Sequence, residues 1–358
     1  MIFTRIFSGD LPRSLVLLVV LVAILAGLLL TPFLFPGAKA LNVAAKICIF
    51  IVLVASFDLL LGYTGIVSFA HTMFFGIGAY GVAIALTLSH TPTWKAVGLG
   101  VLAALGVSLV LSLVIGLFSL RVKAIFYAMI TLAVSTAFMT LASQMSDFTG
   151  GEDGLTFKVP QLISPSFQLF EKPILGVSLD GRIIAFYLVL AATIVLFLLM
   201  LRIVNSPFGR VLQAIRENPF RAEAIGYRTV SYRTSSNVLS AAFATLAGAL
   251  LALWLRYNGP DTSLSFEIMI DILLMVVIGG MGTLYGSVVG ATLFIIVQNY
   301  LQDLMKFASE GMNKVPLMRD LLHPDRWLLW LGILFVLSVY RFPYGIVGKL
   351  RAKARGLI

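Results

Sequence analysis

The chain has 358 residues, of which 59% are hydrophobic and only 12% are charged. Soluble domains carry about 25% charged residues, so this composition excludes a soluble protein and predicts an all-α polytopic membrane protein. The formal charge of +10 does not indicate nucleic-acid binding, because basic residues of membrane proteins collect in the loops that stay in the cytoplasm.

Ten apolar segments are predicted to cross the membrane, and most are long enough to span about 30 Å of hydrocarbon as a helix. They cover residues 14–35, 41–61, 65–88, 96–120, 124–142, 183–204, 235–256, 267–280, 286–303 and 326–342. The first is longer than the apolar region of a signal peptide, roughly 7–15 residues, and is interpreted as a retained span. We expect a single membrane domain over residues 1–358.

Charge in the loops predicts the orientation of the spans. Arginine is in excess in 205–234, basic residues dominate the tail at 343–358, and the loop at 143–181 is acidic on balance. The basic residues are Arg5 and Arg13 near the start, Arg210, Arg216, Arg221, Arg228 and Arg233 in the loop, and Lys349, Arg351, Lys353 and Arg355 in the tail. Since Lys and Arg mark the cytoplasmic side, both termini and 205–234 are expected in the cytoplasm and 143–181 in the periplasm. Ten crossings require the same arrangement.

Metal or nucleotide chemistry is not indicated. Cys48 is the single cysteine and lies in an apolar run, and His71, His90 and His323 are scattered, so neither a disulfide within the chain nor a metal site is expected. The sequence lacks a Gly-x-x-x-x-Gly-Lys-Ser/Thr phosphate-binding loop. We expect no cofactor on this chain, and any ATP would be used by partner subunits.

The stretch at 61–81, LGYTGIVSFAHTMFFGIGAYG, interrupts an apolar region with glycines and polar residues. Within a membrane, irregular backbone is stable only where protein or water satisfies its polar groups. The stretch is therefore either a broken helix that lines a translocation path or a tight turn with close helix packing. Ser68 and His71, one helical turn apart, would face the path or form interhelical hydrogen bonds. Asp58 is costly in lipid and should face the protein interior or the headgroups.

A second glycine-rich stretch, GGMGTLYGSVVGA at 279–291, separates two short apolar segments. Paired Gly-interrupted segments, one in each half of a chain, predict the central site of a transporter. Glu267 and Asp271 lie one turn apart just upstream. An acidic gate is one interpretation, but a helix N-terminus at the membrane interface explains them better.

Residues 205–227 carry helix signals within a basic loop. Pro207 suits the first turn of a helix, 216–219 reads as the end of one helix and the start of another, and Gly226 would stop a short helix at 222–225. Such a helix at the inner face would offer a docking element to a cytoplasmic partner. A basic loop that anchors to lipid headgroups is the alternative.

Together these stretches resemble the permeases of the branched-chain amino acid ABC importer family, of the LivM type. The motifs are G-Y-x-G-x-x-S-x-x-H at 62–71, T-G-G-x-D-G-L at 149–155, R-E-N-x-x-x-A-x-x-x-G at 216–226 and G-G-x-G-T-L-x-G-x-x-x-G-A at 279–291. Three positions depart from the family pattern: Asp58 stands where Asn is more frequent, Ala70 replaces a usual Gly, and Ser287 replaces a usual Pro. A carboxylate at position 58 would change the electric field near the path and so bears on substrate choice.

The resemblance implies a permease subunit of a binding-protein-dependent importer in the bacterial inner membrane. It would form half of the path for branched-chain amino acids or related small polar solutes, such as urea and amides. The implied partners are a second homologous permease, two cytoplasmic ATPase subunits and a periplasmic substrate-binding protein. Path residues expected from the motifs are Tyr63, Thr64, Ser68, His71, Gly280, Gly282 and Thr283. Residues expected to couple to the ATPases are Arg216, Glu217, Asn218, Glu223, Ala224 and Gly226.

Two other classes of function stay open. An ion-coupled secondary transporter would need several carboxylates within the membrane, and only Asp58 and Asp271 qualify. A membrane-embedded enzyme would need a nucleophile and a base within reach of one another. Ser68 and His71 could meet, but no third group is evident to orient them.

Overall fold

A computed structural model of the protein describes residues 14–35, 37–89, 91–119, 124–168, 180–311, 323–342 and 344–354. Some features named from the sequence lie outside the described residues, namely Arg5, Arg13, His90, Arg355 and parts of 143–181 and 343–358. Within the described residues, ten helical segments are long and apolar enough to cross a membrane. The expected all-α, multi-spanning fold is therefore confirmed.

The spanning helices are α2 (Leu15–Leu34), α3 (Ala38–Thr64), α4 (His71–Leu88), α5 (Trp94–Ser119), α6 (Ala124–Gln144), α8 (Gly181–Val204), α11 (Thr229–Leu255), α13 (Phe266–Gly279) with the short α12 (Pro260–Ser263) before it, α14 (Leu284–Gly311) and α16 (Trp327–Arg341). The short elements are α7 (Ser146–Thr149), η1 (Gly151–Asp153), β1 (Leu155–Thr156), η2 (Gln161–Ile163), α9 (Pro207–Glu217), α10 (Pro219–Ala224), β2 (Tyr257–Asn258), η3 (Pro324–Arg326) and α17 (Gly345–Ala354). Two predicted starts are wrong: α11 begins at Thr229 rather than 235, and α4 begins at His71 rather than 65. Hydropathy missed the start of α11 because its first turns are polar although they are helical.

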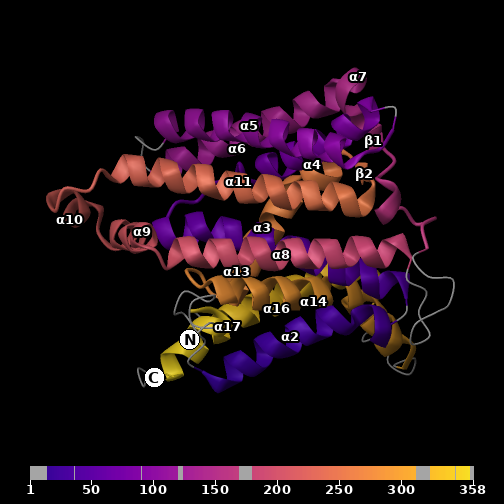
Figure 1. The fold of residues 1–358 in the computed structure, drawn as a ribbon. Helices are drawn as coiled ribbons and strands as arrows, with labels where there is room; N and C mark the ends of the chain where they lie inside the picture. The colour runs from indigo at the N-terminus through magenta and orange to yellow at the C-terminus, as the bar shows by residue number, and fades with distance from the viewer. Residues whose placement is uncertain are drawn as a thin grey trace, which may run out of the picture.

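The helix α3 lies at the centre of the bundle, where it packs against α8, α11, α13 and α14 (Figure 1). Almost all of its residues are buried. Beside it, α4 and α11 approach so closely that a Cβ on Gly78 would lie 2.7 Å from the carbonyl carbon of Thr245. A Cβ on Gly248 would in the same way lie 2.8 Å from the carbonyl carbon of Phe75. Small residues permit such close packing of membrane helices.

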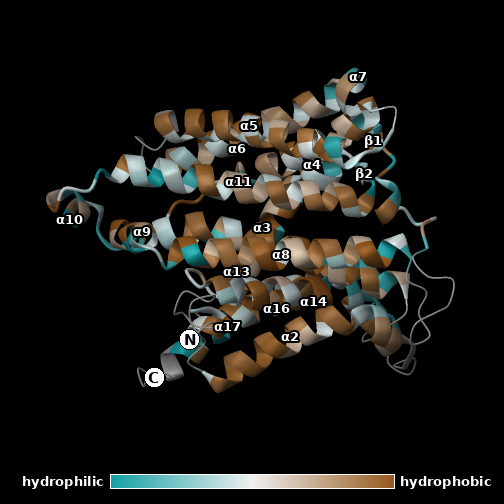
Figure 2. Ribbon diagram, viewed as in Figure 1, coloured by the Kyte–Doolittle hydropathy of each residue, from teal (hydrophilic) through white to brown (hydrophobic). Residues whose placement is uncertain are grey.

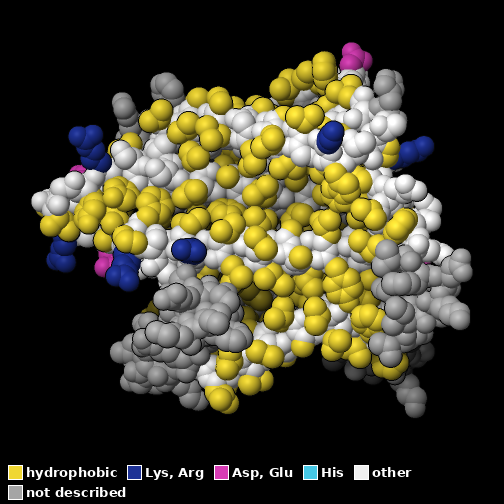
Figure 3. Space-filling view, in the orientation of Figure 1, with side chains coloured by type: hydrophobic (Ala, Val, Ile, Leu, Met, Phe, Trp, Pro, Cys, Tyr) yellow, Lys and Arg dark blue, Asp and Glu magenta, His cyan; other side chains and the backbone are white. Residues whose placement is uncertain are grey.

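The outer helices expose apolar side chains, as expected where the surroundings are lipid. Exposed Leu and Val residues run along α2 and α5. Figure 2 shows hydrophobic residues along the middle of the bundle and hydrophilic residues more often at its two ends. On the face drawn in Figure 3, Lys and Arg side chains gather at the end that carries α9 and α10. This distribution is typical of helices that cross a bilayer between two aqueous sides.

The two ends of the bundle carry different connecting elements (Figure 1). One end holds α9, α10, α17 and the start of α2, and the opposite end holds α7, β1 and β2. The two strands pair antiparallel, with Leu155 opposite Asn258 and Thr156 opposite Tyr257. The described parts of 143–181 and of 205–234 thus lie at opposite ends, as the predicted orientation requires. Which end faces the cytoplasm stays a prediction.

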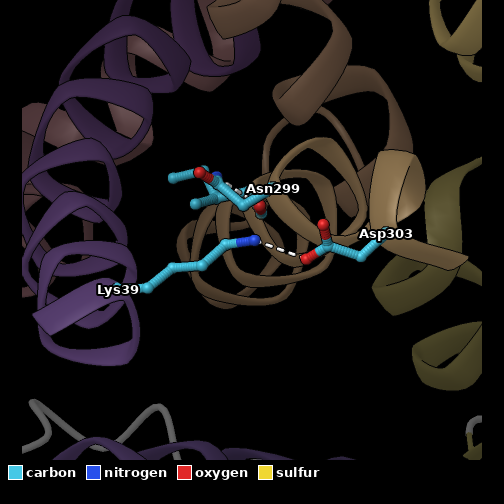
Figure 4. A network of polar contacts seen from close by, with 4 residues as sticks. Lys39, Asn299 and Asp303 are labelled. Carbon is cyan, nitrogen blue, oxygen red and sulfur yellow. Dashed lines mark hydrogen bonds and ion pairs between the residues drawn. The ribbon is translucent and has the colours of Figure 1, made fainter. Parts of the chain in front are cut away.

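An ion pair joins the start of α3 to the second half of α14, at the end opposite to α9 (Figure 4). Lys39 Nζ donates to Asp303 Oδ2, and the side chain of Asn299 donates to the carbonyl of Ile295, both on α14. The side chains of the pair are 55% and 63% exposed. Exposed ion pairs contribute little to stability, so this pair is not expected to determine how α3 and α14 pack.

Candidate functional site

The helix α3 ends at the first glycine-rich stretch, where Gly65 adopts a left-handed conformation with φ of 71°. The N–H of Gly65 donates to the carbonyl of Leu61 at 3.1 Å, and the N–H of Ile66 donates to the carbonyl of Leu60 at 3.4 Å. The bond from Gly65 to Leu61 is that of an αL C-cap, and a residue with a Cβ would be strained at this φ. Gly65 therefore determines where α3 stops and the chain turns back toward α4.

Residues 65–70 form an irregular segment in which buried and open positions alternate. Gly65 is exposed, Val67 and Phe69 are half-buried, and the even-numbered residues are buried. The ring centroids of Phe69 and Phe266, at the start of α13, lie 6.1 Å apart. The segment thus leaves the apolar Val67 and Phe69 partly open and buries Ser68 together with Ile66 and Ala70.

Ser68 and His71 point into the helix bundle. The imidazole Nε2 of His71 lies 2.8 Å from the Oγ of Ser56 on α3, and its ring centroid lies 5.2 Å from that of Phe57. The Oγ of Ser68 accepts a hydrogen bond from the N–H of Ala70 at 3.4 Å, within its own segment. Because α4 begins at His71, the expected helical spacing of Ser68 and His71 is wrong. The contact of His71 with Ser56 is the kind that interhelical hydrogen bonding requires, and a role of either residue in the path stays a prediction.

The second glycine-rich stretch lies against the last turns of α3. Its turn at 280–283 joins α13 to α14, and the N–H of Gly282 donates to Oδ1 of Asp58 at 2.8 Å. The hydroxyl of Thr283 donates to the carbonyl of Gly280 at 2.7 Å and closes the turn. Asp58 is completely buried, so it occupies the protein interior, one of the two environments expected from the sequence.

Arg216 of α9 contacts the site where the end of α3 meets the turn at 280–283. Its guanidinium Nη1 donates to the carbonyl of Gly62, in the last turn of α3. A Cβ on Gly282, which has φ of 78°, would lie 2.8 Å from this Nη1 and 3.0 Å from the carbonyl oxygen of Gly62. A Cβ on Gly65 would lie 3.3 Å from the Cγ of Arg216. Three motifs that are far apart in the sequence therefore meet at one junction.

The structure brings together most of the residues expected to line the path. At the junction, or in the last turn of α3 beside it, lie Tyr63, Thr64, Gly280, Gly282 and Thr283. Tyr63 and Thr64 are buried, and the Thr64 hydroxyl donates to the carbonyl of Leu60. Ser68 and His71 lie beyond the junction, inside the bundle.

The residues expected to couple to ATPases lie on α9 and α10, which protrude from one end of the bundle (Figure 1). The helix α9 begins at Pro207 and ends at Glu217, and α10 begins at Pro219, as the predicted end and new start within 216–219 require. The short helix expected at 222–225 is part of α10, which ends at Ala224. Asn218 caps α10 by accepting a hydrogen bond from the N–H of Arg221 at 3.1 Å. Gly226 follows α10 with φ of 95°. The exposed members of the predicted set are Arg216, Glu217, Glu223, Ala224 and Gly226.

Two large apolar side chains of this protruding end are exposed, Phe220 by 79% and Ile225 by 74%. Exposed apolar groups among polar ones are typical of interaction sites. Our sequence interpretation considered the polar residues of the loop and missed these two. The signal was present, because both are large and apolar within an otherwise polar stretch.

A further polar network inside the bundle was also missed. Lys46 Nζ of α3 donates to Gln298 Oε1 of α14 at 3.3 Å, and Gln298 Nε2 donates to Asp271 Oδ2 of α13 at 3.2 Å. Lys46 could have been noticed as a charge within an apolar run. Glu267 lies in the first turn of α13 after the N-cap Ser265, as the helix-terminus interpretation predicts. Asp271 lies beyond the first turn, so that interpretation does not account for it.

The chain is similar to proteins of a known family. The family model described as the permease component of branched-chain amino acid transport systems matches residues 39–339. This range includes α3 through α14 and with them all elements of the junction.

Three similar proteins carry names of the same kind. The LivM permease protein of high-affinity branched-chain amino acid transport in Salmonella typhimurium is 25% identical over 328 residues, 88% of this chain and 72% of its own. The Escherichia coli LivM protein is 24% identical over 347 residues, 94% of this chain and 76% of its own. A probable LivM protein of Methanocaldococcus jannaschii is 26% identical over 259 residues, 70% of this chain and 69% of its own. No solved structure gives a significant match.

Proposed function

The chain belongs to the permease family of branched-chain amino acid transport systems, and from this premise we propose that it is one permease subunit of a binding-protein-dependent ABC importer. The observation that carries the proposal is the junction. Arg216 of α9 bonds to Gly62 at the end of α3, and both lie beside Gly282 in the α13–α14 turn. A displacement of α9 would therefore be transmitted directly to both glycine-rich stretches, at 61–81 and at 279–291.

The protruding end supplies the docking element for an ATPase. Phe220 and Ile225 offer an exposed apolar contact, and the caps at Asn218 and Gly226 fix the shape of α10. In this role Arg216, Glu217, Asn218, Glu223, Ala224 and Gly226 position or contact the ATPase. ATP is hydrolysed on two separate cytoplasmic subunits, and this chain converts their closure into alternating access.

The open side of 65–70 forms one wall of the translocation path. Gly65, Val67 and Phe69 lie on this side, and the exposed Phe266 lies next to Phe69. A second homologous permease would complete the path. An apolar wall suits solutes with aliphatic side chains, and the names of the similar proteins favour branched-chain amino acids over urea or amides. The solute would arrive from a periplasmic binding protein at the bacterial inner membrane.

An ion-coupled secondary transporter is the rival function. It needs ion ligands near the membrane midplane. Oδ1 of Asp58 accepts a hydrogen bond from Gly282, and Oδ2 of Asp271 accepts one from Gln298. The two carboxylates belong to separate networks. This arrangement does not resemble one shared cation site, so the importer is favoured.

Purification of the tagged chain and reconstitution of what accompanies it test the proposal. We expect two ATPase chains and a second permease to co-purify. Reconstituted in liposomes, the complex should take up a branched-chain amino acid only with ATP and binding protein, and ionophores should not abolish uptake. Uptake by the chain alone, driven by an ion gradient, would establish the rival function instead.

A further inference from the structure

A buried carboxylate lies at the centre of the junction. Asp58 on α3 is 0% exposed and accepts a hydrogen bond from the N–H of Gly282 at 2.8 Å. A Cβ on Gly62, one helical turn later, would lie 2.7 Å from the carboxyl carbon of Asp58. The glycine thus leaves the space that the carboxylate occupies.

Gly282 is held from two sides. Asp58 binds its N–H, while the guanidinium of Arg216 lies against its Cα and donates to the carbonyl of Gly62. A carboxyl side chain from α3 and a guanidinium from α9 therefore enclose the α13–α14 turn.

We propose that Asp58, Gly282 and Arg216 form a latch through which α9 moves the α13–α14 turn together with the end of α3. The inference rests on the proposed importer function and adds a residue to it. Asp58 is a positioning residue in this role, because it acts through the turn and the guanidinium rather than on the solute. Buried polar contacts suit such a connection, since breaking one leaves an unpaired group away from water.

Substitutions at position 58 separate the hydrogen bond from the charge. Asp58→Asn keeps an oxygen that can accept from Gly282 but removes the carboxylate, whereas Asp58→Ala removes both. We expect the number of solute molecules transported per ATP hydrolysed to fall by about tenfold for Asp58→Ala and by a smaller factor for Asp58→Asn. The double variant Arg216→Gln and Asp58→Asn should lower the number of solute molecules transported per ATP by no more than the more severe single variant does. This is expected because the two changes break the same connection.

A matched control removes another buried hydrogen bond to α3. Thr193 Oγ1 of α8 donates to the carbonyl of Cys48 at 3.1 Å, so Thr193→Val reports a purely structural loss. It should lower the melting temperature of the reconstituted complex while the ratio of transport to hydrolysis stays at the wild-type value. If Asp58→Ala does not assemble, the nearly isosteric Asp58→Asn carries the comparison.

A distance measurement tests the latch without reference to turnover. Spin labels at Gln213→Cys on α9 and Met281→Cys in the turn, with Cys48→Ala as background, report the separation of the two elements. We expect one narrow distance distribution that persists when the ATPases are trapped closed, and a broad one in Asp58→Ala. If Asp58→Ala matches Thr193→Val in coupling and keeps the narrow distribution, the latch is wrong while ATP-driven uptake by the wild type still supports the importer. If the wild type shows no ATP-driven uptake, both proposals fall.

Discussion

The imidazole of His71 lies where three helices meet. Its Nε2 is 2.8 Å from the hydroxyl of Ser56 on α3, and Ser240 of α11 donates to the carbonyl of Ser56 at 2.6 Å. His71 itself opens α4. A buried side chain with these partners is suited to holding helices together, whereas contact with a solute would require an open position such as that of Phe69.

We expect His71→Ala to lower the stability of the complex by about 1–2 kcal/mol, because it removes one interhelical hydrogen bond and leaves a small cavity. Thermal unfolding of the purified complex measures this loss, and uptake per surviving complex should stay near the wild-type rate. Phe69→Ala is the contrasting variant and should change uptake or solute preference with a smaller effect on stability. A stable His71→Ala complex with slow uptake would place His71 in the path after all.

Glycine and cap positions were predictable from the sequence because their causes are local. Gly65 must tolerate a positive φ, and Asn218 caps the helix that follows it. The directions of Ser68 and Phe69 were not predictable, because a helical spacing was assumed where the chain is irregular. The bond between Arg216 and Gly62 was also hidden, since no local pattern connects residues 154 positions apart.

At the scale of elements, α9 and α10 form a short helical pair bounded by caps. The N–H of Gly226 donates to the carbonyl of Glu223 at 2.9 Å, and Gly226 has φ of 95°. Proline cannot adopt this φ and has no N–H to donate. A change at this position should therefore alter the shape of α10 while leaving the spanning helices intact.

We expect Gly226→Pro to leave the subunit inserted and folded but to lower complex assembly or solute-stimulated ATP hydrolysis several-fold. Glu217→Lys, at the exposed end of α9, should have a similar effect because it reverses a charge on the docking element. Glu152→Lys, an exposed charge reversal at the opposite end, is the matched control. ATPase assays on reconstituted complexes measure the effect, and unchanged stimulation in both loop variants would remove the coupling role.

At the scale of the whole molecule, the number of spans followed from composition because lipid imposes the length and polarity of each helix. Ten segments were predicted, and the described part of the chain contains ten candidate spans. Their arrangement around α3 did not follow, because inner and outer helices are both apolar. Residues such as Leu53 in the core and Leu99 on the surface look alike in the sequence.

The charges of the connecting loops predict which end of the molecule faces the cytoplasm. Arginine excess places 205–234 inside, and Ser231 is exposed near the start of α11, whereas Glu152 is exposed at the opposite end. Single cysteines at these positions, in a Cys48→Ala background, should respond oppositely to an impermeant thiol reagent. In intact spheroplasts Glu152→Cys should be labelled and Ser231→Cys protected, and both should be labelled after lysis. Cys48 is fully buried, so its replacement removes the native thiol without changing the surface. Labelling of Ser231→Cys in intact spheroplasts would invert the topology, and an ATPase could then no longer dock on α10 from the cytoplasm.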